Sequence, residues 1–185
     1  MKRTPIRTFT LLSATVLLVL SGCARPTFEG KVGGQILREF NNFADEIRRN
    51  AAEAYAKGIP LTEDYLRDKR PITVILDLTQ AAPEALSSTD AVSSGSVLYA
   101  VATDEKGQTG TSSFYTDAGT NLNGFAHAEA HLFACADITV TYEAKPRTTM
   151  ANGACPAPMQ QTILSQQYSL INAVTGEVEQ RPPRR

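Results

Sequence analysis

Apolar residues recur every three or four positions over residues 36–55, with charged side chains between them. They are Ile36, Phe40, Phe43, Ile47, Ala51 and Tyr55. This spacing places them along one stripe of an amphipathic helix. We expect the helix to stop at or just before Gly58, which can adopt a left-handed cap conformation ahead of Pro60. The stripe is expected to cover a core, although a membrane surface or a partner protein would also fit it.

A second, shorter helix is predicted after Thr62, whose hydroxyl can cap it. Glu63 and Asp64 fall in its first turn and basic residues near its end, which suits the helix dipole. Alternation of apolar and polar residues over residues 72–79 then predicts a strand in the middle of a sheet. Residues 80–95 show no sustained period, so they are expected to form a mobile loop or to hold one helical turn near residues 84–86.

A hairpin is predicted next, with strands at residues 96–103 and 109–115 and a turn between them. Asp117 and the residues up to Gly124 are interpreted as the following turn. Residues 126–142 then alternate without a break, which predicts a long antiparallel strand. Its alanines (Ala126, Ala128, Ala130, Ala134 and Ala136) share one face with larger apolar residues and would let the long helix pack closely.

The carboxyl-terminal part is expected to comprise a loop at residues 146–158, one or two strands over residues 160–171 and a disordered basic tail at residues 179–185. Together the patterns predict one α+β domain over residues 35–178. In it, one long and one short N-terminal helix pack on a four- to six-stranded, mainly antiparallel sheet. The element order is that of cystatin-like and NTF2-like folds, by analogy only.

The amino terminus has the pattern of an export signal. Lys2, Arg3 and Arg7 precede an apolar run over residues 9–20 that is shorter than the roughly 20 residues needed to span a membrane. Leu20-Ser21-Gly22-Cys23 closes the run. This segment resembles that of bacterial lipoprotein precursors, in which a leucine and two small residues precede the acylated cysteine. The resemblance covers about the first 23 residues, and an ordinary signal peptide with an unmodified cysteine is the alternative.

The resemblance implies that residues 1–22 are removed and that Cys23 carries the lipid. Two or more acyl chains would hold the protein firmly, since one chain alone binds only marginally. Residues 23–34 are glycine-rich and are interpreted as an acylated, flexible tether. We therefore expect a protein anchored by lipid to the cell membrane or outer membrane, with its domain facing the periplasm or the cell exterior.

Charge limits the partners. Removing the signal from the 185-residue chain leaves 15 basic and 19 acidic side chains, a formal charge of −4. Nucleic acid is excluded as a partner because its phosphates require clustered Lys and Arg. An envelope protein or another ligand remains open as a partner.

Two cysteines, Cys135 and Cys155, remain after Cys23 is set aside. Export to an oxidising compartment predicts that they form a disulfide. A catalytic thiol acting with His127 or His131 is the alternative.

His127, Glu129 and His131 are the candidate metal ligands or acid–base residues. On a helix the two histidines could share one metal ion, but on a strand they lie about 13 Å apart, which is too far. Because the alternation favours a strand, the interpretation preferred here is a solvated row on its outer face. The alternative interpretation is a contact whose strength changes with pH near the pKa of histidine.

No catalytic residue and no cofactor is assigned. The serines lack the G-x-S-x-G pattern, and no glycine-rich phosphate loop precedes a helix. Asp77, Asp117, Asp137 and Glu143 cannot be paired from sequence alone. The favoured hypothesis is a non-enzymatic binding or interaction module of the cell envelope. The alternatives are a metal-dependent or acid–base enzyme using His127, Glu129 and His131, and a structural accessory subunit of an envelope complex.

Overall fold

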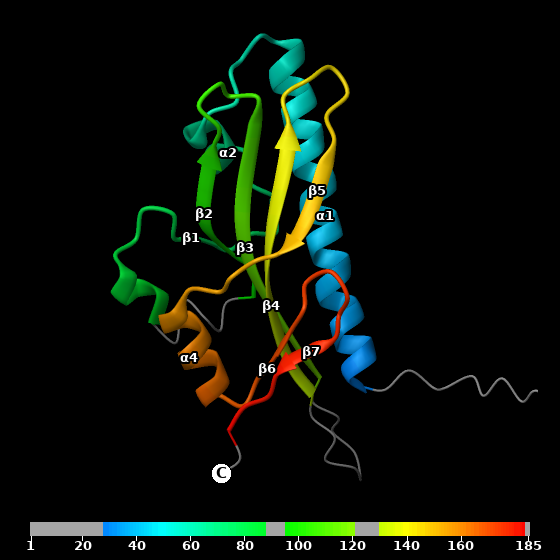
Figure 1. Ribbon diagram of the computed structural model, residues 1–185, viewed down its shortest axis with the longest axis vertical. Helices are drawn as coiled ribbons and strands as arrows, with labels where there is room; N and C mark the ends of the chain where they lie inside the picture. Colours follow the sequence, from blue (N-terminus) through cyan, green and yellow to red (C-terminus); the bar gives the residue numbers. More distant parts are fainter. Residues whose placement is uncertain (1–27, 88–94, 121–129, 184–185) are drawn as a thin grey trace, which may run out of the picture.

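The computed structural model describes residues 28–87, 95–120 and 130–183, in which helices flank one mixed sheet (Figure 1). Seven strands form the sheet in the order β1-β2-β3-β4-β6-β7, and β5 pairs with β4 beside β6. Four of the six strand pairings are antiparallel and two are parallel. The α+β class is therefore confirmed, and the sheet has one strand more than the upper end of the predicted four to six.

Helix α1 (Phe28–Ala56) lies along what we term the first face of the sheet (Figure 1). Its buried stripe includes Ile36, Phe40 and Phe43, as the periodicity predicts, and Gly58 beyond its end has a φ of +64°. The helix starts earlier than expected, so residues 28–34 of the predicted tether are helical. Val32 is buried in the core there. This burial offsets the roughly 1 kcal/mol by which each glycine disfavours a helix.

Helix α2 (Glu63–Asp68) confirms the predicted second helix, since Thr62 Oγ1 accepts a hydrogen bond from the Tyr65 amide at 3.1 Å. The predicted central strand is wrong. Only β1 (Leu76–Asp77) forms, as a parallel strand at the sheet edge. Ile72 and Ile75 are 89% and 66% exposed. The segment turns between Val74, which packs under α1, and Leu76, which packs on the opposite side of the sheet.

The following segment includes the short helix η1 (Pro83–Ser87), which matches the helical turn expected there. Strands β2 (Val97–Thr103) and β3 (Thr109–Thr120) confirm the predicted hairpin. Strand β3 continues past Tyr115, so Asp117 lies in a strand and not in the expected turn.

Strand β4 (Ala130–Thr141) confirms the long alternating strand as far as the described residues extend; residues 126–129 lie outside them. Its alanines and larger apolar residues face α1, and the small side chains allow the predicted close packing. The other face of β4 is not simply solvated. There, on the second face of the sheet, Phe133 and Cys135 pack with Tyr115 against Met159 and Ile163 of α4.

The carboxyl-terminal part differs most from expectation. It contains β5 (Thr148–Asn152), helix α4 (Ala157–Ser165), β6 (Ser169–Ile171) and β7 (Val178–Gln180). Residues 160–165, predicted as strand, are helical because α4 buries Met159 and Ile163, one helical turn apart, on the second face. Strand β6 is parallel to β4 and fills the space below β5 (Figure 1).

The predicted disordered tail also needs correction within the described residues. Glu179 and Gln180 lie in β7. Arg181 Nη1 lies 2.8 Å from Glu29 Oε1 at the start of α1. The beginning and the end of the described chain therefore meet.

Candidate functional site

A pocket of about 310 Å³ lies between α1 and the edge of β3. Strand β2 begins at Val97, which pairs with Tyr115, so β3 runs on beyond its neighbour (Figure 1). Residues 116–118 of this uncovered stretch line the pocket on one side, and Ile36 and Glu39 of α1 line it on another. The volume is at the lower end of the range for small-molecule sites in proteins.

Asp117 is the chemically distinctive residue of this pocket. Burial raises the pKa of its carboxyl group to about 6 from an ordinary value of 3.8, and the backbone amides of Asp117 and Gly95 partly offset the rise. Its Oδ1 atom is buried and accepts no hydrogen bond from any described residue. An unsatisfied buried acceptor costs roughly 1–3 kcal/mol, so this oxygen destabilises the fold slightly.

Gly95 shapes the pocket beside Asp117. Its φ of +89° lies in the left-handed region, which side chains other than glycine rarely adopt. A Cβ atom added there would also lie 3.4 Å from Ile75 Cδ1. Glycine therefore allows the turn that directs the Gly95 amide to the Asp117 carboxyl group.

The remaining lining is apolar with a few polar groups. Ser96 and Thr116 are both buried, and their hydroxyl groups are hydrogen-bonded to each other at 2.9 Å. Ile36, Ile75 and Ala118 supply apolar surface. Among the described residues that line the pocket, none is Lys or Arg. The electrostatic environment therefore favours a cationic or N–H-bearing ligand over an anion.

Aromatic side chains lie near Asp117. Burial raises the pKa of the Tyr115 hydroxyl, and the negative charge of Asp117 raises it further. The same two causes, in the same order, raise the pKa of Tyr168. The rings of Tyr168 and His131 lie 4.9 Å apart between centroids. Both shifts keep the phenols neutral at neutral pH.

The alternation suggested that His131 lies on a solvated outer face of its strand. The structure shows a different position. His131 is partly buried in β4 beside Tyr168, and it pairs with Gly119 of β3. A Cβ atom at position 119 would collide with the imidazole, so glycine makes room for this ring. His127 and Glu129 lie outside the described residues. Within the described parts of the chain, no three His, Cys, Asp or Glu side chains are placed to hold a metal ion.

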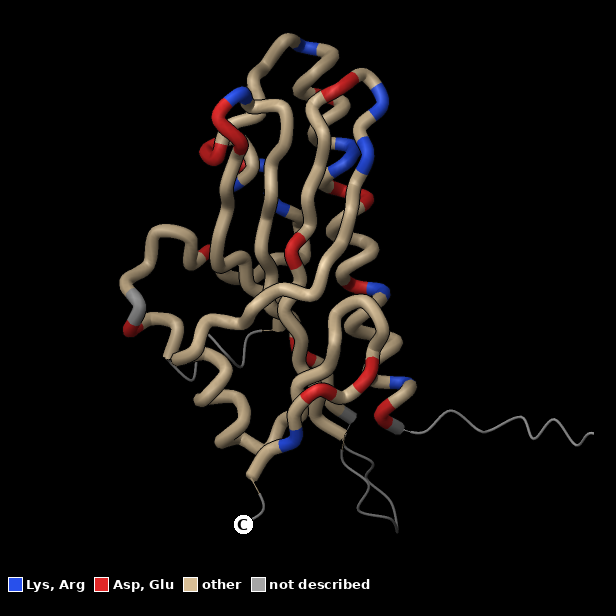
Figure 2. Tube along the Cα trace, in the orientation of Figure 1, with Lys and Arg blue, Asp and Glu red and all other residues tan. Residues whose placement is uncertain are grey.

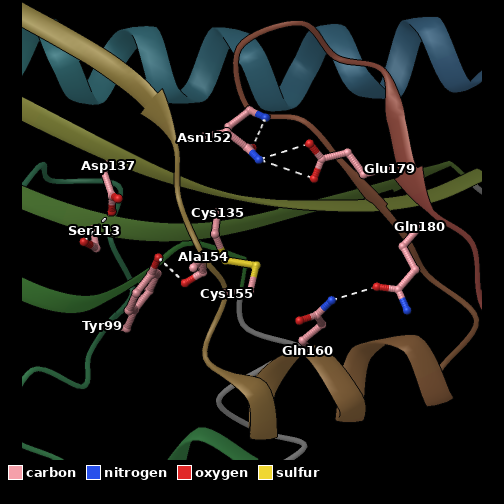
Figure 3. The surroundings of a disulfide bond; sticks show 11 residues. Tyr99, Ser113, Cys135, Asp137, Asn152, Ala154, Cys155, Gln160, Glu179 and Gln180 are labelled. Carbon is pink, nitrogen blue, oxygen red and sulfur yellow. Dashed lines mark hydrogen bonds between the residues drawn. A yellow bond between two sulfur atoms is a disulfide. The ribbon is translucent and has the colours of Figure 1, made fainter.

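The predicted disulfide is confirmed. Cys135 of β4 is bonded to Cys155, which lies between β5 and α4, with 5.3 Å between the Cα atoms (Figure 3). The Gly153 amide donates a hydrogen bond of 2.9 Å to the Cys135 carbonyl oxygen. Beside the bond, the Tyr99 hydroxyl donates to the Ala154 carbonyl oxygen at 3.3 Å (Figure 3). The two cysteines therefore have a structural role and do not supply a free catalytic thiol.

The four carboxylates left unpaired by the sequence do not converge on one site. Asp77 Oδ2 lies 3.6 Å from Arg70 Nη1, and Asp137 accepts a hydrogen bond of 2.6 Å from Ser113 Oγ (Figure 3). The pKa of Glu143 is lowered by hydrogen bonds from Thr141 and Arg147. Only Asp117 of the four has a buried oxygen without a hydrogen bond in the described structure.

Cys23 lies outside the described residues. Within the described parts of the chain, no helix is long and apolar enough to cross a membrane.

No protein-family model, curated protein or solved structure matches this chain.

Proposed function

We propose that this chain is a lipid-anchored protein of the cell envelope that binds a small ligand without transforming it. The ligand carries an ammonium or another N–H donor group, which the negative charges of Glu39 and Asp117 attract, and an apolar part, which contacts Ile36, Ile75 and Ala118. The single observation that carries this proposal is an accessible pocket whose described lining includes the carboxylates of Glu39 and Asp117 and contains no Lys or Arg.

The anchoring half of the proposal is supported by sequence. The basic start, the apolar run and Leu20-Ser21-Gly22-Cys23 together resemble lipoprotein precursors. Cleavage before Cys23 would leave only four residues between the acylated cysteine and Phe28, the first residue of α1. An acylated tether would then be shorter than the sequence suggested, and the domain would lie close to the membrane that holds it.

The binding half is tested with simple probes on the mature chain. We expect n-butylammonium to give saturable NMR shifts at the amides of residues 36, 39, 75, 95 and 116–118 at pH 7.5. Butyrate should give none, because the pocket lining is acidic. Asp117→Asn should abolish the response, and Asp68→Asn, an exposed control, should retain it. Shifts that survive Asp117→Asn, or butyrate binding at the same amides, would contradict the proposal.

The alternative of an enzyme that uses His127, Glu129 and His131 has less support than ligand binding. Its candidate residues His127 and Glu129 lie outside the described residues, and His131 packs on Tyr168. An accessory role in an envelope complex is also open. The basic tail at residues 179–185 could contact an acidic partner in such a complex, although its Arg181 is paired with Glu29. The likeness to cystatin-like and NTF2-like folds is an analogy of element order, from which no function follows.

A further inference from the structure

A second hollow, of about 360 Å³, lies farther along α1 and has the opposite electrostatic character. Arg48 and Arg49 of α1 and Lys145 of the turn between β4 and β5 line it. Among its described lining residues there is no Asp or Glu, although the chain as a whole is acidic after removal of its signal. Figure 2 shows basic residues gathered where this turn approaches α1. We call this hollow the basic pocket.

Two of its three cations have no ion-pair partner among the described residues. Arg48 Nη2 lies 2.9 Å from Asp45 Oδ1, so its charge is largely balanced. Within the described parts of the chain, Arg49 and Lys145 form no ion pair. The basic pocket therefore presents about two positive charges, which come from two different elements.

The backbone that carries these charges is fixed. Ile47 and Ala51, on either side of Arg49 in α1, are buried in the core. The turn is closed by a hydrogen bond of 3.0 Å from the Thr141 amide to the Arg147 carbonyl oxygen, and Pro146 within it is buried. The backbone at both charged residues is therefore already ordered before a ligand binds.

We propose that the basic pocket binds the phosphate group of a small solute or of a lipid headgroup. A phosphate monoester carries a charge of about −1.5 to −2 at pH 7, which matches the combined charge of Arg49 and Lys145. The Arg49 guanidinium can donate two parallel hydrogen bonds to phosphate oxygens, and Lys145 supplies a further charge. Ala52 and Ala144 leave the space between them free of bulky side chains.

This site is independent of the pocket at Asp117. Arg49 lies ten residues beyond Glu39 in α1, which corresponds to about 15 Å along the helix axis. A failure of phosphate binding would leave the proposed amine site unaffected, and the reverse also holds.

The test is an NMR titration of the mature chain with inorganic phosphate, with sodium chloride holding the ionic strength constant. We expect saturable shifts confined to the amides of residues 48–52 and 144–147. The double variant Arg49→Gln/Lys145→Gln should bind phosphate about tenfold more weakly or worse, because charge-assisted hydrogen bonds are lost. Arg38→Gln, which removes an exposed cation elsewhere on α1, should leave the affinity unchanged.

One variant should move the affinity in the other direction. Asp45→Asn releases Arg48 from its carboxylate partner and should tighten phosphate binding by about two- to threefold. Absence of saturable shifts, or equal affinities in the double variant and Arg38→Gln, would overturn the proposal.

A vesicle arm separates the two sources of phosphate. Co-sedimentation with vesicles containing phosphatidic acid, whose headgroup is a phosphate monoester, is compared with phosphatidylcholine vesicles alone. Binding that requires Arg49 and Lys145 and is displaced by inorganic phosphate identifies a lipid headgroup as the source. Phosphate binding in solution without such co-sedimentation identifies a soluble phosphate ester.

Discussion

At the scale of residues, Asp117 is the most unusual group of the proposed ligand site, because burial raises the pKa of its carboxyl group. From the sequence, Asp117 was one of four carboxylates without an assigned role, and it was placed in a turn because Asp117, Gly119 and two asparagines within eight positions are typical of one. Residues 109–118 show no apolar–polar alternation, so no periodic signal marked the continuation of β3 past Tyr115. The start of β2 was predicted to within one residue, but the extension of β3 beyond it, which lets residues 116–118 line the pocket, was not.

Asp117 makes the stability of the fold depend on pH. With a pKa of about 6, the folded chain binds this proton more tightly than the unfolded chain, where the value is near 3.8. Stability from this group is therefore lost as pH rises from about 4 to about 6. We expect the stability of Asp117→Asn relative to wild type to rise by about 1–3 kcal/mol between pH 4 and pH 7.

Urea unfolding at several pH values measures this difference. Asp68→Asn is the control, since Asp68 is exposed at the end of α2. A difference between wild type and Asp117→Asn that is the same at pH 4 and pH 7 would mean that the carboxyl group is not perturbed by burial.

At the scale of elements, the strength of a pattern decided what the sequence could predict. The long helix and the strand β4 were predictable because each keeps one period over many residues. Helix α4 was missed because it is short and buries only Met159 and Ile163, which cannot be told from a strand by period alone. Residues 72–79 alternate, yet the chain crosses from one side of the sheet to the other there, which no local pattern encodes.

The disulfide links the elements that were hardest to predict. It fastens the segment between β5 and α4 to β4 and closes a loop spanning 20 residues. Cys135→Ala/Cys155→Ala should lower the free energy of unfolding by about 3 kcal/mol. Denaturant unfolding of the oxidised protein, with and without a reducing agent, checks this value. The reductant should destabilise wild type and leave the double variant unchanged; equal stability of both proteins would contradict a structural role.

At the scale of the whole molecule, the proposed anchor and the two proposed sites fall along α1. The helix has 29 residues, so it is about 43 Å long. The proposed anchor lies before its first residue, the pocket at Asp117 beside its first half and the basic pocket beside its second half. An anchored molecule would therefore present its two ligand sites at different distances along the same helix.

Cys23→Ala tests the anchor. We expect this variant to leave the membrane fraction or to remain unprocessed, because acyl chains on Cys23 supply the membrane affinity. Fractionation of cells followed by mass spectrometry of the amino-terminal peptide measures both effects. Ala24→Ser, which keeps the thiol, is the control and should fractionate like wild type. Full processing and tight membrane binding of Cys23→Ala would show that the lipoprotein interpretation is wrong.

The most direct test of the central claim is the titration of the Asp117 side-chain carboxyl carbon by NMR, with and without n-butylammonium. Without the amine, we predict a midpoint near pH 6. With saturating amine the midpoint should fall, because an ammonium group stabilises the ionised carboxylate. A midpoint near 3.8, or one that n-butylammonium does not move, would contradict the account.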